Sequence, residues 1–114
     1  MNIVMPRGDL RQVAFTIRSP DDGSPITDFS EIFFTVKKTY KDRLFLFQKR
    51  LTKGDIVLNE EDGYQFTILP KDTDKLPFGE YVYDIEVVRE EDIKQTFAGR
   101  LLLSEEVTYS ENER

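Results

Sequence analysis

The sequence contains no cysteine, no histidine and no tryptophan among its 114 residues. Without cysteine it cannot form a disulfide framework, a thiolate zinc site or a thiol nucleophile. Without histidine it cannot use imidazole as a catalytic base or as a metal ligand. These absences exclude most hydrolase chemistry, and we expect a protein that is not an enzyme and holds no cofactor.

Basic residues and long apolar segments are also scarce. The chain carries 22 acidic and 16 basic residues, a net charge of −6, and this field repels phosphate backbones, so we expect no nucleic-acid partner. The first residues lack the apolar core of a signal peptide, and no segment approaches the about 18 apolar residues of a membrane span. We therefore expect no membrane partner, and a protein that stays in a cytoplasm unless it leaves inside an assembly.

What the sequence does contain is a pattern of short β-strands. Apolar residues recur with period two in five runs, and weaker strand patterns occur at 2–5, 43–51 and 55–58. Turn residues separate the runs, and the one helix-like window is very short, so the pattern predicts an all-β, antiparallel sandwich of seven to eight short strands. We expect one domain over 1–106 and a polar C-terminal tail over 107–114. The five clearer runs are 13–17, 32–36, 64–68, 81–87 and 97–103.

Two places break this alternation and indicate an interface. Phe33 stands beside Phe34, and the run from 44 to 47, interpreted as a strand, is apolar on both faces. A half-exposed antiparallel strand normally has one polar face, so something should cover the second face. Either a loop of the same chain covers it, or it forms a self-association or partner surface. The candidate interface residues are Phe33, Leu44, Phe45, Leu46 and Phe47.

The stretch "KDTDK" at 71–75 allows two interpretations. Asp72 and Asp74 could offer oxygens to calcium, but a calcium site needs about six or more ligands, and the spacing of an EF-hand is absent. The favoured alternative is a turn in which the side chain of Asp72 or of its neighbour accepts backbone hydrogen bonds. Tyr81 follows Gly79 at the start of a strand, where sandwich domains often hold a tyrosine bonded back into the preceding corner. We expect Asp72, Gly79 and Tyr81 to form a structural corner and no metal site.

Two other charge patterns stay open. The acid–glycine stretches at 21–23 and 60–63 are typical of hairpin turns, and a hydrolase would need two carboxylates about 5 to 10 Å apart in a cleft. Lys and Arg gather between 37 and 53, which indicates either a solvated hairpin or an electrostatic docking surface.

The order of motifs resembles one family of small bacteriophage structural proteins. The early Gly8–Asp9 pair precedes "G-Y-x-F-x-I-x-P-x-D-T-x-x-L" at 63–76, "G-x-Y-x-Y-D-I" at 79–85, "T-x-x-G-x-L" at 96–101 and "EVT" at 106–108. Together these motifs, which cover nearly the full chain, resemble the N-terminal Ig-like domain of upper-baseplate, or tail-fibre attachment, proteins in phages and prophages of Gram-positive bacteria.

This resemblance implies an Ig-like sandwich that acts as a virion structural or assembly module of the tail, baseplate or head–tail region. Its partners would be other phage structural proteins, with a homo-oligomer as a second option. It would be assembled in the cytoplasm of the host bacterium and reside in the virion. The family has no active site to carry over. The alternative from another class is a module that binds carbohydrate or a cell surface, which would need several aromatic side chains facing solvent on one concave surface.

Overall fold

The computed structural model describes residues 2–59, 63–90 and 93–105, so the expected tail at 107–114 lies outside it. Within the described residues the chain forms eight strands and one short helix, which confirms the all-β class and the predicted strand number. None of their helices is long and apolar enough to cross a membrane. The elements are β1 (Asn2–Pro6), β2 (Arg11–Phe15), β3 (Glu31–Lys37), β4 (Phe47–Arg50), β5 (Ile56–Asn59), β6 (Gly63–Ile68), α1 (Pro70–Thr73), β7 (Gly79–Arg89) and β8 (Ile93–Ser104).

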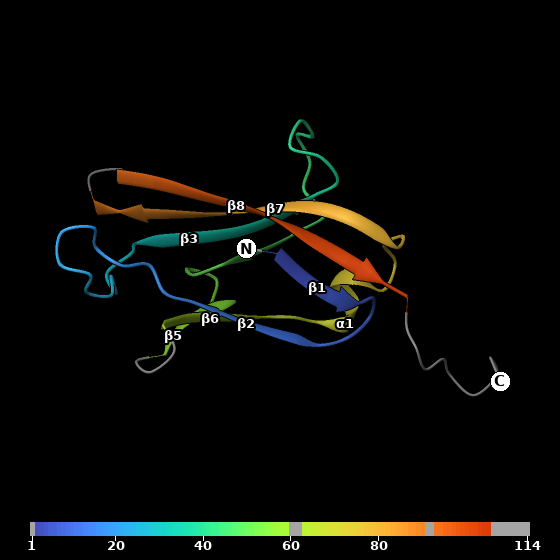
Figure 1. Ribbon diagram of the computed structural model, residues 1–114, viewed down its shortest axis with the longest axis horizontal. Helices are drawn as coiled ribbons and strands as arrows, with labels where there is room; N and C mark the ends of the chain where they lie inside the picture. The colour runs from blue at the N-terminus through green and yellow to red at the C-terminus, as the bar shows by residue number, and fades with distance from the viewer. Residues whose placement is uncertain (1, 60–62, 91–92, 106–114) are drawn as a thin grey trace.

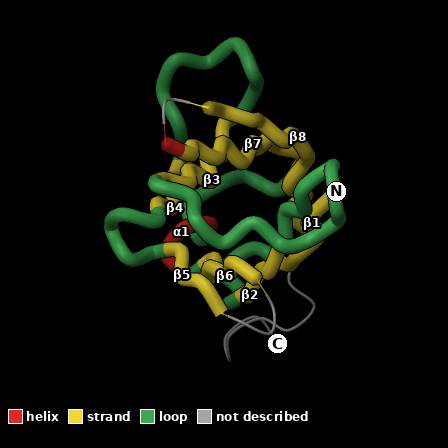
Figure 2. Tube along the Cα trace, turned by 90° about the vertical axis from the view of Figure 1, so that its left-hand side faces the viewer, coloured by secondary structure: helices red, strands yellow, loops and turns green. Residues whose placement is uncertain are grey.

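The strands form two sheets that face one another as two layers (Figures 1 and 2). The larger sheet has the order β1-β8-β7-β3-β4, and the smaller has the order β2-β6-β5. The pairings are antiparallel except that β1 runs parallel to β8, with Asn2 opposite Arg100. This one parallel pair departs from a wholly antiparallel sandwich. After β1 the chain passes from the larger sheet to the smaller one through a turn in which Gly8 has a φ of 81°.

The core lies between the sheets and follows from the period-two pattern. Alternate residues of β3, β6 and β7 are buried, because successive side chains of a strand point to opposite faces. The ring of Phe34 on β3 lies 4.3 Å from the ring of Phe66 on β6, measured between centroids, and 5.2 Å from that of Tyr83 on β7. Burying such a side chain stabilises the fold by roughly 1.5–3 kcal/mol, so these contacts hold the two layers together.

The prediction of a strand over residues 44–47 with two apolar faces is wrong. Phe47 begins β4 and is 8% exposed in the core, whereas Leu44, Phe45 and Leu46 precede the strand and are 84%, 50% and 42% exposed. They belong to the loop 38–46, which projects beyond the larger sheet (Figures 1 and 2). Alternation between faces applies only to residues in one extended strand, and here the chain becomes extended only at Phe47.

Candidate protein-docking face

The larger sheet has an outer face that points away from the core. On β3 and β7 this face carries the residues between the buried ones, with Phe33 opposite Glu86 and Thr35 opposite Asp84. On β4 it carries Gln48, whose side-chain amide donates to the Thr35 hydroxyl over 2.9 Å. The face thus combines an aromatic ring with charged and polar groups.

The loop 38–46 adds apolar side chains to this face. Phe45 and Phe33 line one shallow depression of about 320 Å³, together with Lys37, Arg43, Asp84 and Glu86. Phe33 comes from the sheet and Phe45 from the loop, 12 positions apart in the sequence. The structure therefore brings together two of the five candidate interface residues, places exposed Leu44 and Leu46 beside Phe45 in the same loop, and assigns Phe47 to the core.

Polar contacts hold this loop against the sheet. The Lys37 ammonium donates to the Asp42 carbonyl over 2.8 Å, and the Asp42 carboxylate accepts the Thr39 amide hydrogen over 3.1 Å. The Tyr40 hydroxyl donates to the Gly99 carbonyl of β8 over 3.1 Å. A loop that is already held loses less conformational entropy when it binds, which favours its use as a docking element.

A charged network lies at the end of β3. The Arg50 guanidinium donates to the Glu31 carboxylate over 2.9 Å and lies 4.8 Å above the Phe33 ring. Burial by itself would raise the pKa of Glu31, but hydrogen bonds from the hydroxyl and amide of Thr52, from Arg50 and from the Ile32 amide lower that pKa to about 2. Glu31 is therefore ionised at neutral pH and orients Arg50 over the aromatic part of the face.

Asp84 on β7 has the opposite electrostatic setting. Burial, followed by repulsion from Glu86, raises the pKa of the Asp84 carboxyl, and Lys37 only partly offsets this. The carboxylate of Asp84 is thus incompletely compensated within the chain. A partner that brings a cationic side chain to this part of the face would be favoured.

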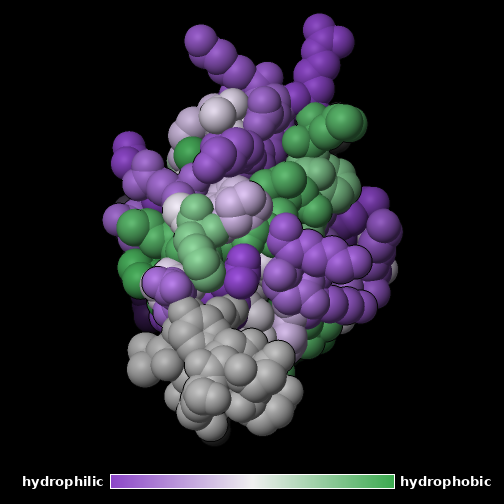
Figure 3. Space-filling model, turned by 90° about the vertical axis from the view of Figure 1, so that its right-hand side faces the viewer, coloured by the Kyte–Doolittle hydropathy of each residue, from purple (hydrophilic) through white to green (hydrophobic). Residues whose placement is uncertain are grey.

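The predicted corner lies between α1 and β7. The Tyr81 hydroxyl donates to the Pro77 carbonyl over 2.6 Å, and Gly79 has a φ of 136°, a conformation that glycine adopts without strain. The Asp72 carboxylate accepts the Leu69 amide hydrogen over 2.7 Å and so caps the single turn of α1. These are the geometries expected of a structural corner. Figure 3 shows the side of the molecule that lies on the right in Figure 1, where hydrophilic surface surrounds several hydrophobic patches.

Sequence reasoning missed a buried ion pair at this corner. The Lys49 ammonium lies 2.6 Å from the Asp72 carboxylate, and both side chains are about nine-tenths buried. Lys49 occupies a core-facing position of β4, opposite Phe34. The sequence contained a sign of this ion pair. Lys49 stands two positions after the apolar Phe47 and so shares its face of the strand, and a lysine buried there requires an acidic partner.

The acidic stretches at 21–23 and 60–63 show no metal-binding arrangement in the described part of the chain. Asp22 accepts hydrogen bonds from the amide and hydroxyl of Ser24, as a turn residue does. The acids at 60–62 lie outside the described residues. Within the ranges 2–59, 63–90 and 93–105, no three acidic side chains gather into a group that could hold a metal ion.

The strand order and the tyrosine corner together define the class of protein. One sheet joins β8, β7 and β3, with β1 and β4 at its edges, and it faces a sheet of β2, β6 and β5, which is the arrangement of an immunoglobulin-like sandwich. The protein is an immunoglobulin-like β-sandwich.

Comparisons with known proteins add little to this class. No protein-family model matches the sequence, and no curated protein matches it. Among solved structures the chain is similar to the solution structure of the first Ig-like domain of human CD48 antigen, with a TM-score of 0.46 and 12% sequence identity over 95% of this chain and 84% of that one. At this level the likeness says nothing about what the chain binds.

Proposed function

We propose that this protein is a non-enzymatic docking module that binds another protein through the loop 38–46 and the adjoining outer face of the larger sheet. The observation that carries the proposal is the exposure of Leu44, Phe45 and Leu46 on a loop that hydrogen bonds already hold in place. Exposed apolar side chains gathered on one such element are typical of interaction surfaces.

The composition of this face fits a protein partner better than a carbohydrate. Phe33 and Phe45 supply an apolar centre, and Lys37, Arg43 and Glu86 supply a charged rim, as in protein–protein interfaces. A sugar platform would need open aromatic faces, but the Arg50 guanidinium covers one face of the Phe33 ring. Carbohydrate binding therefore remains the alternative with less support.

The biological setting that we propose is a bacteriophage virion, in which the module joins tail, baseplate or head–tail proteins after assembly in the bacterial cytoplasm. Support for this comes from the order of motifs between Gly8 and Thr108, which resembles that of upper-baseplate proteins. The neighbouring genes provide the direct check: tail and portal genes beside this one would support the setting, and a metabolic operon would oppose it.

The docking proposal can be tested by photocrosslinking in the bacterium that produces the protein. A photoreactive phenylalanine analogue replaces Phe45, and the matched control carries it at Val57, which is 46% exposed on β5 in the smaller sheet. We expect one discrete crosslinked protein from position 45 and none from position 57. Equal crosslinking from both positions, or none from position 45, would contradict the proposal.

A further inference from the structure

Strand β8 is paired along only part of one edge. On one side it pairs with β7 from Ile93 to Leu103, but on the other side β1 covers only Arg100–Ser104. Among the described residues no strand pairs with the remaining edge, 93–99. An open strand edge presents unpaired amide and carbonyl groups and is a template for pairing with another chain.

The open half of β8 also lacks cover over its side chains. Phe97, Leu101 and Leu103 have the same parity on the strand and point to the same side of the sheet. Leu101 and Leu103 are 0% and 3% exposed beside β1, whereas Phe97 is 44% exposed. Burial of the inner side of β8 therefore stops where β1 stops.

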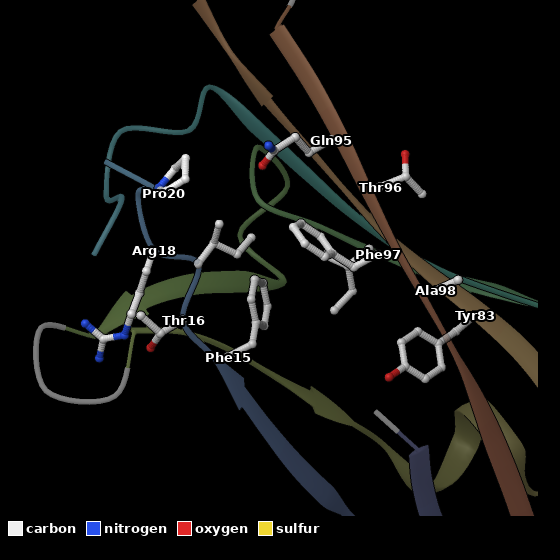
Figure 4. Close-up of a pocket in the computed structure, with 11 residues that line it drawn as sticks. Phe15, Thr16, Arg18, Pro20, Tyr83, Gln95, Thr96, Phe97 and Ala98 are labelled. Carbon is white, nitrogen blue, oxygen red and sulfur yellow. The ribbon is translucent and has the colours of Figure 1, made fainter. Parts of the chain in front are cut away.

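An apolar groove of about 700 Å³ adjoins this open edge. Figure 4 shows the rings of Phe15 and Phe97 approaching it from the two sheets, with Tyr83 further along. Ile17, Pro20, Ile85 and Ala98 complete the apolar part of the lining. A groove of this kind next to a free strand edge suits an added strand, whose backbone pairs with the edge while alternate side chains enter the groove.

We propose that the segment 106–114 of a second copy of this chain adds as a strand to the edge 93–99, with Val107 and Tyr109 in the groove. The segment reads "EVTYSENER", in which these two apolar residues stand two positions apart among polar ones. Side chains two positions apart share one face of a strand in either strand direction. The alternation in the segment thus matches a groove that lies on one side of the edge.

The charges of the segment and of the groove are complementary. The segment contains Glu106, Glu111 and Glu113 against one arginine, Arg114. Arg18 is the one charged residue among the described residues that line the groove, and Lys94 is exposed on the edge strand.

Val107 cannot reach the edge 93–99 of its own chain, because its backbone lies at most about 11 Å from Ser104, whereas Gly99, the near end of that edge, lies about 17 Å from Ser104. Tyr109 is five residues beyond Ser104, so its backbone lies at most about 18 Å from that residue. Phe97 is seven residues before Ser104 in an extended strand, which places it about 23 Å away. In addition, β1 occupies the edge that a returning chain would have to follow. A second copy is therefore the donor that allows both Val107 and Tyr109 to pair along this edge.

Sedimentation of the full chain provides the first test. We expect concentration-dependent association that Tyr109→Asp weakens by at least about tenfold, because a charge replaces the ring in the apolar groove. Thr108→Asp, on the opposite face of the added strand, is the matched control and should change association by less than about threefold. Excess synthetic peptide of residues 104–114 should dissociate the assembly. A wild-type chain that stays monomeric, or equal effects of the two substitutions, would overturn the proposal.

Crosslinking shows which surface binds the segment 106–114. It also distinguishes this proposal from the proposal that the loop 38–46 docks a partner. A photoreactive phenylalanine analogue at position 109, in a chain mixed with a ¹⁵N-labelled copy, should attach to peptides 15–20 or 93–99 of the other copy. Crosslinks to the loop 38–46, or crosslinks confined to the same chain, would refute the proposal. Leu44→Glu should leave the association unchanged, so failure here and failure of the docking face are distinguishable.

Discussion

The hydroxyl of Tyr81 closes the corner between α1 and β7 through one hydrogen bond to the Pro77 carbonyl. Tyr81→Phe removes that bond, leaves the buried ring in place and leaves the acceptor without this donor. We expect a loss of about 1–2 kcal/mol in the free energy of unfolding with the fold intact, measured by urea denaturation.

The control for this substitution is Tyr40→Phe. The Tyr40 hydroxyl also donates to a carbonyl, that of Gly99, but the side chain is exposed, so water can replace the lost bond. The change should stay within about 0.5 kcal/mol. Equal losses from the two variants would mean that the Tyr81 hydroxyl contributes no more than a surface contact.

The lowered pKa of Glu31 makes stability depend on pH. Its folded-state pKa is about 2, below the ordinary value of 4.5, so the stabilisation is fully present above about pH 4.5 and is lost as the pH falls towards 2. The shift corresponds to about 2–3 kcal/mol after allowance for solvent screening near the surface. Glu31→Gln should therefore lower the free energy of unfolding at about pH 7 much more than at about pH 3, measured in urea.

Asp84→Asn should change the free energy of unfolding in the opposite direction to Glu31→Gln. Because the folded-state pKa of Asp84 is raised, its ionised form is disfavoured in the folded protein at neutral pH. Removing the charge should increase stability at neutral pH and have little effect in acid, where the carboxyl is already protonated. A loss of stability at neutral pH would show that the Lys37 contact outweighs burial and the repulsion from Glu86.

At the scale of elements, the boundary between the loop 38–46 and β4 determines whether the protein stays folded when two residues of the run 44–47 are changed together. Leu44→Glu with Leu46→Glu changes two exposed loop residues, so the protein should remain folded. Phe45→Glu with Phe47→Glu places a charge at a core position 8% exposed and should cost more than about 3 kcal/mol. Circular dichroism during thermal unfolding measures both. Unfolding by the loop pair would mean that the chain itself needs those side chains.

At the scale of the whole molecule, the ion pair between Lys49 and Asp72 joins the two layers. Lys49 belongs to the larger sheet, and Asp72 to the helical turn that follows the smaller one. Asp72→Ala leaves a buried ammonium without its partner and removes the cap of α1, so we expect a loss of about 3–5 kcal/mol. The exposed neighbour Asp74, changed to Ala, should cost less than about 1 kcal/mol. Unfolding of the two variants in denaturant measures both losses of free energy.

The two roles assigned to Asp72 also lead to a test for calcium binding. If Asp72 serves as cap and ion-pair partner, the melting temperatures of the wild-type protein in calcium and in EDTA should agree within about 2 °C, because a ligand that binds only the native state raises the midpoint. A clearly higher midpoint in calcium would restore the metal-site interpretation of Asp72 and Asp74.

The period-two pattern predicted the class of fold and most of the strands, since it reports which side chains can share a buried face. It placed Phe34, Phe66 and Tyr83 in the core, where they lie. The position of Tyr81 two residues after a glycine indicated a hydrogen bond back into the corner, and its hydroxyl donates to the Pro77 carbonyl, because a tyrosine corner is built from residues close in sequence. Local patterns of this kind need no knowledge of distant neighbours.

The sequence by itself determined the excluded chemistry, the alternating faces of the strands and the turn residues, because these follow from single residues and their nearest neighbours. Only the tertiary structure decided that Leu44, Phe45 and Leu46 leave the strand, that Lys49 meets Asp72, and that β1 covers only part of β8. Each of these depends on segments far apart in the chain, and their juxtaposition is set by the packing of two sheets. No local pattern along the chain specifies which distant segments this packing brings together.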